Sequence, residues 1–426
     1  MSTQQIIKFV IFICFFTSFC FNVYVFKPLN NKAYLAATQD SYNIYAYLSD
    51  DDAQHSPNRE TIQNSTKRET IHWNDTIKYR NPPKIYICNG DSGNGMGESK
   101  LLLTAALPEY TINDLSQMKI GEGRPPKSFP PEYLEMNYTN PHDVFVSTFS
   151  MEHCTPKIYK WLLTHFNGQI AIFSGESEKD HPIRGVNRDH VHAFGPLMHA
   201  RNQDMVVTYL QMTYWKIFQE ILTPSVMVDP KLRPRGTQNH YMMYANSNCV
   251  GFREEAVGRL SEFGPIHCGG KCKGKTPPSG NRTNLVKIKT DVGIRNWWEN
   301  VKYYADYRFC FVMEHEESHP TYMTEKIIMA FSAGCIPIYY GPAEILNIFN
   351  EKAFVFYNIS DPEPALKQVK ALEENKEMYE MMLQEPIVAQ GNLTIEKYFS
   401  FSDDVGGGAM KRIMREKLGL GDHFMP

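Results

Sequence analysis

The sequence lacks an excess of charge of either sign. Its 426 residues carry 44 basic and 47 acidic side chains, which gives a formal net charge of −3. The basic side chains form no cluster that would indicate a nucleic-acid face, and the chain has no bulk attraction to anionic lipid. We therefore expect no nucleic-acid partner, and any site for an anionic ligand must be built locally.

The sequence also has few hydrophobic residues in long runs. One such run is present, between Lys8 and Lys27. The run, FVIFICFFTSFCFNVYVF from Phe9 to Phe26, has 18 uncharged residues, about the minimum that crosses a hydrocarbon core. No small-residue cleavage motif follows it, so we expect a signal anchor with the rest of the chain in a lumen or outside the cell. Six Asn-x-Ser/Thr sequons support this placement, at Asn64, Asn74, Asn137, Asn281, Asn358 and Asn392.

Cysteine is sparse as well, with nine residues, of which seven lie outside the apolar run. Seven is an odd number, so at least one thiol should remain free. Cys310 and Cys335 fall in predicted buried strands and are expected to be small apolar side chains of the core. Cys249, Cys268 and Cys272 are close in sequence and are expected to include a disulfide in an oxidising compartment. A zinc site there would need a fourth ligand, and one histidine is near.

The chain divides by composition into segments of different kinds. Residues 28 to 82 are polar, without apolar periodicity, which is typical of a stem. Beyond them, apolar runs alternate with helical patterns and indicate α/β domains with parallel sheets, and the stretch from Leu222 to Gln238, with three prolines and a glycine, indicates a linker. We predict a cytoplasmic tip and anchor at 1–27, a stem at 28–82, a first domain at 83–222, a second at 238–395 and a tail at 396–426.

Local patterns predict the elements of each domain. In the first domain, strands are expected at 84–88, 143–149, 169–173 and 204–210, with a helix at 156–165. In the second, a strand is expected at 238–245, a helix at 251–263, a short strand at 265–267 and a helix at 364–384.

The stretch from Tyr307 to Pro342 has the pattern of a strand, a helix and a second strand. YRFCFVM (Tyr307–Met313) indicates a buried strand, the apolar residues after Lys326 repeat at helical spacing, and Gly334 is a typical helix terminator. The run from Ile336 to Tyr340 indicates the next strand, parallel to the first. Thr-Glu-Lys then lies at the carboxyl edge of the sheet, where helix N-termini present free N–H groups to anions.

This stretch, YRFCFVMEHEESHPTYMTEKIIMAFSAGCIPIYYGP, resembles the donor-binding motif of the inverting α1,3/α1,4-fucosyltransferases of the glycosyltransferase family 10 type. SNCVGFREEAVGRL (Ser247 to Leu260) and FSGESEKDHP (Phe173 to Pro182) resemble two further elements of that family. The resemblance implies two Rossmann-like domains facing a cleft, the GT-B type of α/β fold. It implies inverting transfer of L-fucose from GDP-β-L-fucose to a hydroxyl of a glycan acceptor on glycoprotein or glycolipid, α1,3 linkage being most typical. With the anchor, it implies a single-pass type II protein of the Golgi membrane with a lumenal catalytic domain.

The implied donor site agrees with the chemistry of its residues. Lys326, at a helix start, places positive charge where negative charge develops on the leaving diphosphate. Arg253 begins another helix and can bind phosphate oxygens in a bidentate manner. By the resemblance, Glu325 faces the ribose hydroxyls and Tyr322 lies beside the phosphates. The implied donor-binding set is Arg253, Glu314, Tyr322, Thr324, Glu325 and Lys326.

Glu176 is the predicted general base. It follows the strand QIAIF and Gly175, which places it at the carboxyl end of a strand in the first domain, and it matches the base position of the family. An inverting transfer needs one group that takes the proton of the attacking hydroxyl. Glu178 is the competing carboxylate.

One segment departs from the family pattern. Where the family has Phe-Glu-Asn/Ser, this chain has Met313-Glu314-His315-Glu316-Glu317, and the spacing from Glu314 to Lys326 is one residue longer. His315 is the candidate for the place of the asparagine.

No metal is implied. The acidic runs at 50–52 and 403–404 are away from any predicted strand end, so no Asp-x-Asp site for a divalent ion is expected, and the donor substrate needs no further cofactor. Two other hypotheses remain: a GT-B transferase that uses another nucleotide sugar, and a non-catalytic membrane-anchored glycan-binding relative.

Overall fold

A computed structural model describes residues 83–87, 96–114, 141–148, 166–173, 190–195, 205–289, 297–315 and 321–420. All of them belong to one compact unit, Lys78–Pro426. The predicted anchor, stem, helix at 156–165, Glu176 and Glu178 lie outside the described residues. Within the described ranges, no helix is both long and apolar enough to cross a membrane.

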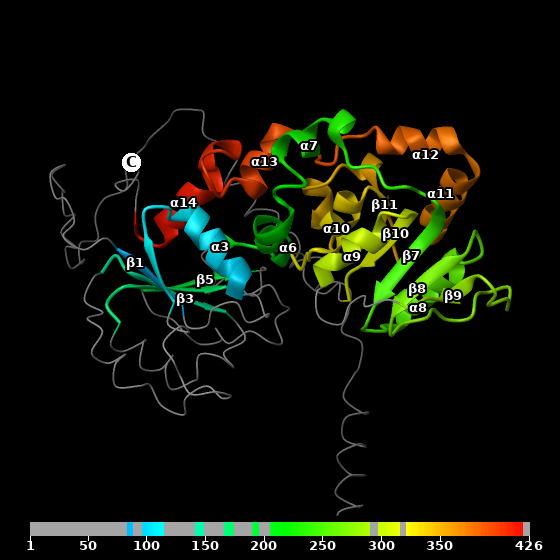
Figure 1. The fold of residues 1–426 in the computed structure, drawn as a ribbon, viewed down its shortest axis with the longest axis horizontal. Helices are drawn as coiled ribbons and strands as arrows, with labels where there is room; N and C mark the ends of the chain where they lie inside the picture. The colour runs from blue at the N-terminus through cyan, green and yellow to red at the C-terminus, as the bar shows by residue number, and fades with distance from the viewer. Residues whose placement is uncertain are drawn as a thin grey trace, which may run out of the picture. The chain divides into compact units, whose positions relative to one another are not determined.

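The first sheet is built from the N-terminal half of the described chain (Figure 1). Its six described strands are all parallel, in the order β2-β1-β3-β4-β5-β6. The bounds are β1 Lys84–Ile87, β2 Thr111–Asp114, β3 Val144–Thr148, β4 Gln169–Phe173, β5 Val191–Gly195 and β6 Met205–Val206. Helix α3 (Met96–Ala106) buries Leu102 and Leu103 in the core of this sheet. The expected strands at 84–88, 143–149 and 169–173 are confirmed.

The expected strand at 204–210 is wrong beyond its first residues. The strand stops at Val206, and helix α6 runs over Tyr209–Thr213. Thr208 and Gln211 form a capping box: the Thr208 hydroxyl accepts from the Gln211 N–H, and the Gln211 side chain accepts from the Thr208 N–H. Since this pair satisfies two N–H groups at the helix start, it outweighs the β-propensity of the preceding valines.

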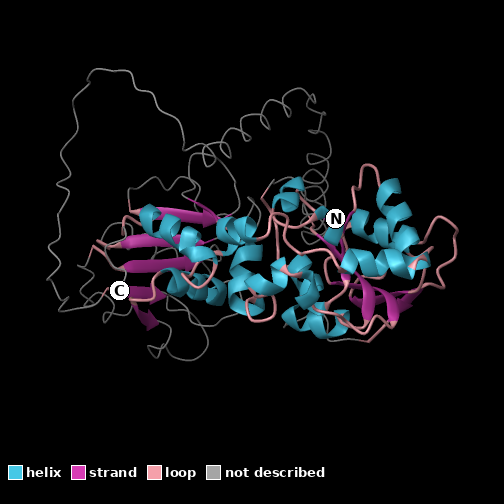
Figure 2. Ribbon diagram, turned by 90° about the horizontal axis from the view of Figure 1, so that it is seen from above, coloured by secondary structure: helices cyan, strands magenta, loops and turns pink. Residues whose placement is uncertain are grey.

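The second sheet holds six described strands, again all parallel, in the order β12-β11-β10-β7-β8-β9. The bounds are β7 His240–Asn246, β8 Ile266–Gly270, β9 Leu285–Lys287, β10 Tyr307–Met313, β11 Ile336–Tyr340 and β12 Val355–Phe356. Figure 2 shows these strands side by side with helices packed on them. The two parallel α/β sheets expected from the alternation of strands and helices are therefore confirmed.

The β10-α10-β11 unit forms as the sequence predicts. Helix α10 spans Lys326–Ala333, and β10 pairs with β11 in parallel with Phe309 opposite Ile336. Gly334 ends the helix at a φ of +80°, where a Cβ would lie 2.4 Å from the backbone nitrogen of Gly236. Both the left-handed backbone and the close approach of a second chain segment require glycine there.

The predicted helix at 364–384 is two helices, α11 (Glu363–Glu374) and α12 (Lys376–Leu383). Asn375 separates them with a φ of −128°, and its side chain accepts from the backbone N–H groups of Glu377 and Met378. An asparagine that caps the second helix in this way replaces the continuous helical bond pattern.

The expected linker and tail both contain ordered helices. Residues 222–238 include α7 (Pro224–Val228), and the tail contains α14 (Ala409–Lys417), whose Arg415 forms an ion pair with Glu109 at 2.7 Å. The other helices are the π-helix η3 Tyr214–Phe218, η4 Pro230–Leu232, α8 Gly251–Leu260, η5 Trp297–Glu299, α9 Asn300–Tyr304, η6 Ala343–Asn347, η7 Glu351–Ala353, α13 Asn392–Phe399 and η8 Gly406–Gly408.

Cys310 and Cys335 are joined in a disulfide, which corrects the expectation that they are unbonded core side chains. Cys335 lies just before β11, in which Pro337 is the residue opposite Cys310, and the Cα atoms of the two cysteines are 5.9 Å apart. That separation is typical of a disulfide. The pairing joins a residue of β10 to the turn that leads into β11, and it cannot be read from either strand pattern alone.

Candidate donor site

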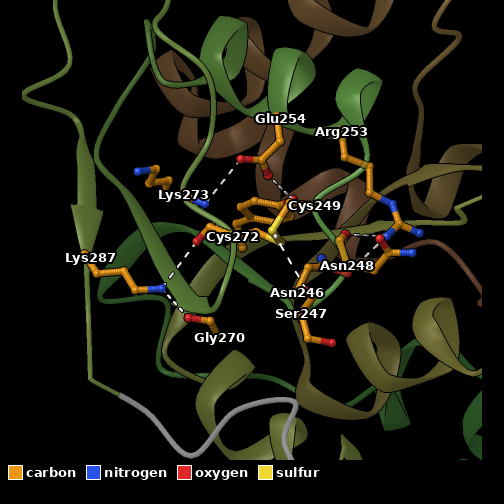
Figure 3. The surroundings of a disulfide bond; sticks show 11 residues. Asn246, Ser247, Asn248, Cys249, Arg253, Glu254, Gly270, Cys272, Lys273 and Lys287 are labelled. Atoms are coloured by element: carbon orange, nitrogen blue, oxygen red, sulfur yellow. Dashed lines mark hydrogen bonds between the residues drawn. A yellow bond between two sulfur atoms is a disulfide. The ribbon is translucent and has the colours of Figure 1, made fainter. Parts of the chain in front are cut away.

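Arg253 lies in the first turn of α8 with 1% of its surface exposed. Its guanidinium points back to the ends of two neighbouring strands. Nε donates to the backbone oxygen of Glu314 at 3.2 Å. Nη1 donates to Asn246 Oδ1 at 3.4 Å and to the Asn248 backbone oxygen at 3.3 Å (Figure 3). Nη2 has no partner among the described residues. A buried guanidinium with an unused donor is suited to an anion.

The charge of Arg253 is balanced in part by its surroundings. Burial lowers the pKa of the guanidinium, and the nearby carboxylates of Glu314 and Glu325 and the hydroxyls of Tyr244 and Tyr322 oppose that shift. Because an arginine keeps its proton near neutral pH, the site holds a desolvated cation.

A disulfide between Cys249 and Cys272 fixes the loop that carries two of these Arg253 partners (Figure 3). The backbone N–H groups of Lys271 and Cys272 both donate to the backbone oxygen of Asn246, at 3.0 and 3.1 Å. The predicted disulfide in this cysteine group is therefore confirmed. Glu254 lies beside the two sulfurs, but because they are bonded to each other they offer no thiolate pair to a metal.

Cys268 is the free cysteine of the described residues. It is buried in β8, and burial raises the pKa of its thiol to about 12, helped by the negative charge of Glu254. A thiol of this kind is inert at neutral pH.

The carboxylate of Glu314 is the centre of the Thr-Glu-Lys element. Glu314 follows β10, and its side chain is 0% exposed. Its Oε1 accepts from the Thr324 N–H at 2.8 Å, its Oε2 accepts from Lys326 Nζ at 3.0 Å, and the Thr324 hydroxyl lies within 2.9 Å of both oxygens. Lys326 Nζ also donates to the Thr324 hydroxyl oxygen at 2.7 Å.

Lys326 keeps its proton in this setting. Burial lowers the pKa of the ammonium, but the carboxylates of Glu314 and Glu325 outweigh burial and hold the pKa above its ordinary value. The Glu325 carboxylate is 4.0 Å from Nζ, and the Lys326 side chain is 19% exposed.

Gly341 makes room for this arrangement. It follows β11, and a Cβ at this position would lie 2.3 Å from the Tyr339 hydroxyl and 2.9 Å from Glu314 Cγ. The Tyr339 hydroxyl is buried against Glu314, so burial and the negative charge of that carboxylate both raise its pKa. The sequence pattern Ile-Pro-Ile-Tyr-Tyr-Gly thus ends in glycine for a steric reason.

Tyr322 and His315 are paired next to this cluster. The Tyr322 hydroxyl lies 3.2 Å from His315 Nδ1, with the rings edge to face at 5.2 Å between centroids. Tyr322 is 2% exposed. His315, the residue of the departing segment, thus contacts a predicted donor residue.

Helix α6 contacts the segment just before Thr324: the Leu210 N–H donates to the Met323 backbone oxygen at 3.1 Å. Thr324 and Lys326 thus contact the Glu314 carboxylate, Arg253 contacts the Glu314 backbone oxygen, and Glu325 lies beside Lys326. The predicted base Glu176 lies outside the described residues. Asn246 and Tyr339 were missed by sequence reasoning. Asn246 directly follows the predicted strand at 238–245, at the same sheet edge, and this position was the available signal.

Residues 235–384 match the family model described as "Glycosyltransferase family 10 (fucosyltransferase) C-term". This stretch forms a glycosyltransferase family 10 domain. It contains all six residues of the donor set and both cysteines of the Cys249–Cys272 disulfide.

Known proteins similar to this chain include a fucosyltransferase-named protein of Acanthamoeba polyphaga mimivirus, 25% identical over 139 residues. The matched stretch is 32% of this chain and 22% of that relative, about a fifth of its length. The crystal structure of an α1,3-fucosyltransferase with GDP-fucose is 18% identical, with 79% of this chain and 90% of that chain covered and a TM-score of 0.48. An α-glucosyltransferase in complex with UDP-glucose and DNA is 11% identical, with 70% and 92% covered and a TM-score of 0.40.

Proposed function

We propose that this chain transfers L-fucose from GDP-β-L-fucose to a hydroxyl of a glycan acceptor, with inversion at the anomeric carbon. The observation that carries the proposal is the position of the donor set. Arg253 and Lys326 lie inside the family 10 stretch, and the fold brings both to one residue: Arg253 donates to the backbone oxygen of Glu314, and Lys326 donates to its carboxylate. Two desolvated cations at the carboxyl edge of a parallel sheet suit a nucleoside diphosphate.

In the proposed reaction, the acceptor hydroxyl oxygen attacks C1 of fucose while the bond from C1 to the β-phosphate oxygen breaks and GDP leaves. The proton of the hydroxyl goes to Glu176. The support for this base is its place in the sequence three residues after β4 (Gln169–Phe173), where a carboxylate at the carboxyl end of a parallel strand can reach an acceptor. Arg253 and Lys326 stabilise the charge that develops on the diphosphate.

The finer points of the function are part of the same proposal. They comprise an α1,3 linkage, an acceptor glycan on glycoprotein or glycolipid, and a GT-B arrangement of the two α/β domains. They also include a type II single-pass placement in the Golgi membrane with the catalytic domain in the lumen. The apolar run of residues 9–26 supports the anchor. The sequon asparagines Asn281, Asn358 and Asn392 are exposed, as a lumenal chain with N-linked glycans requires.

Metal independence is proposed as well. Its support is that Arg253 and Lys326 already place two positive charges at the site. Such side chains stabilise the negative charge of the leaving diphosphate, as a divalent ion does in other transferases.

Calorimetry with the purified full chain tests the proposal directly. We expect the chain to bind GDP more tightly than UDP or ADP, and to transfer fucose from GDP-fucose to members of a glycan array. Binding of UDP in preference to GDP would favour a transferase that uses another nucleotide sugar. Glycan binding without any nucleotide binding would favour the non-catalytic alternative.

A further inference from the structure

Glu314 has no exposed surface, so its carboxylate has no face to offer to a bound nucleotide. Its oxygens are instead occupied by Thr324 and Lys326, through the Thr324 N–H, the Thr324 hydroxyl and the Lys326 ammonium. Thr324 is 3% exposed and is equally enclosed. Both residues belong to the predicted donor set, and both are enclosed by the protein.

The hydrogen bonds among Glu314, Thr324 and Lys326 show which group donates in each contact. A threonine hydroxyl has one hydrogen, so it donates to Glu314 and accepts from Lys326. The ammonium has three N–H groups, of which one goes to Glu314 Oε2 and one to Thr324 Oγ1. The third has no hydrogen-bond partner in the described part of the chain, where the next carboxylate oxygen, on Glu325, is 4.0 Å away.

We propose that Glu314 and Thr324 are positioning residues that act through Lys326. Together they fix the ammonium so that its third N–H is directed to the donor diphosphate. The inference rests on the proposed function, because it assumes that a nucleoside diphosphate binds here.

The ion pair between Glu314 and Lys326 is costly to break. Removing one partner of a buried ion pair leaves an uncompensated charge and is strongly destabilising. Lys326 therefore keeps its contact with Glu314 when a ligand binds, and uses its remaining N–H for the phosphate. Because the Lys326 ammonium is held in place before the nucleotide binds, it needs no reorganisation in the transition state.

A double-mutant cycle on GDP affinity tests whether Glu314 acts through Lys326. We expect Glu314→Gln and Lys326→Ala each to weaken GDP binding about tenfold, and the double variant to bind GDP as Lys326→Ala does. If Glu314→Gln still weakened binding in the Lys326→Ala background, Glu314 would act on its own and the proposal would be wrong. Unchanged affinity in Glu314→Gln would also overturn it.

Thr324 offers a matched pair of variants that does not depend on removing a buried charge. Thr324→Val keeps the volume but loses the hydroxyl, and should weaken GDP binding about tenfold, whereas Thr324→Ser keeps the hydroxyl and should bind within about twofold of the unmodified chain. Guanosine, which has no phosphate, should bind equally to all three. A general structural defect would instead weaken guanosine and GDP alike, and that result would overturn the positioning role.

Failure of the proposed function looks different from failure of this inference. If the unmodified chain binds no GDP, the proposed function itself is wrong. If it binds GDP and Thr324→Val binds it equally well, the proposed function stands and the role of Thr324 is refuted.

Discussion

Lys326 Nζ lies 3.0 Å from Oε2 of Glu314, a carboxylate buried from solvent. This ion pair neutralises much of the lysine charge inside the protein. Arg253 differs, because its hydrogen-bond partners are backbone oxygens and the amide oxygen of Asn246. The larger share of uncompensated positive charge for a diphosphate therefore comes from Arg253.

Arg253→Lys should weaken GDP binding, because lysine keeps the charge but lacks the planar set of donors that reaches three oxygens and still leaves Nη2 for a ligand. We expect GDP affinity to fall by about tenfold or more, as for the loss of a hydrogen bond to a charged group. Calorimetry with GDP measures it. Arg259→Lys, on the same helix but in an ion pair with the exposed Glu363, is the matched control and should change little.

Gly341→Ala should damage both the stability of the fold and the donor site. The added Cβ would meet the Tyr339 hydroxyl and Glu314 Cγ, so one of them must move. Overpacking of a buried site costs about 1–3 kcal/mol of unfolding free energy. Urea unfolding monitored by fluorescence measures the change, and GDP affinity should fall in parallel because Glu314 holds Lys326.

The control for this substitution is Gly251→Ala, near Arg253 in the first turn of α8. A Cβ there would meet nothing within 4 Å. Alanine at an unstrained helical position stabilises by about 0.4–1 kcal/mol. If Gly341→Ala were as stable as Gly251→Ala, the steric account of the glycine after β11 would be refuted.

The meeting of Arg253 with Glu314 can be predicted from the sequence because parallel sheets align the carboxyl ends of their strands. Arg253 follows β7 and Glu314 follows β10, and these strands are neighbours, so residues 61 positions apart meet at one edge. The β10-α10-β11 unit can be predicted as well, since helical periodicity and Gly334 indicate its helix.

Other features depend on register and on packing between segments, which local patterns do not contain. The Cys310–Cys335 disulfide joins β10 to the turn just before β11, and the two strand patterns do not contain this proximity. The burial of Glu314 follows from the close approach of Tyr339, which Gly341 permits. The helix at Tyr209–Thr213 did have a local signal, the Thr208 and Gln211 capping box, which the apolar pattern concealed.

Transfer should survive removal of divalent ions. Arg253 and Lys326 are expected to supply the positive charge that stabilises the departing GDP, so no metal is needed for that step. We expect the initial rate of fucose transfer after dialysis against EDTA to stay within about twofold of the untreated rate, since no Lewis acid is lost. Abolished transfer that returns on addition of Mn²⁺ would contradict the metal-free proposal.

Glu176→Gln tests the proposed base, which lies outside the described residues and rests on its place after β4. Glutamine keeps the size and the hydrogen-bonding capacity of the side chain but cannot accept a proton at neutral pH. Because general-base catalysis contributes about 10²–10⁴-fold, transfer should fall by that factor. GDP affinity should stay that of the unmodified chain, since the donor residues come from the second sheet.

Glu178→Gln is the matched control for this substitution, two residues along the chain. Only one carboxylate can lie in line with the attacked carbon, so this variant should transfer fucose at close to the normal rate. Rates of transfer at saturating GDP-fucose, with GDP affinity from calorimetry, separate the two variants. An inactive Glu178→Gln beside a nearly normal Glu176→Gln would move the base by two residues. Activity in both would place the base elsewhere in the first domain, and the likeness of Phe173 to Pro182 to the family element would then carry no catalytic meaning.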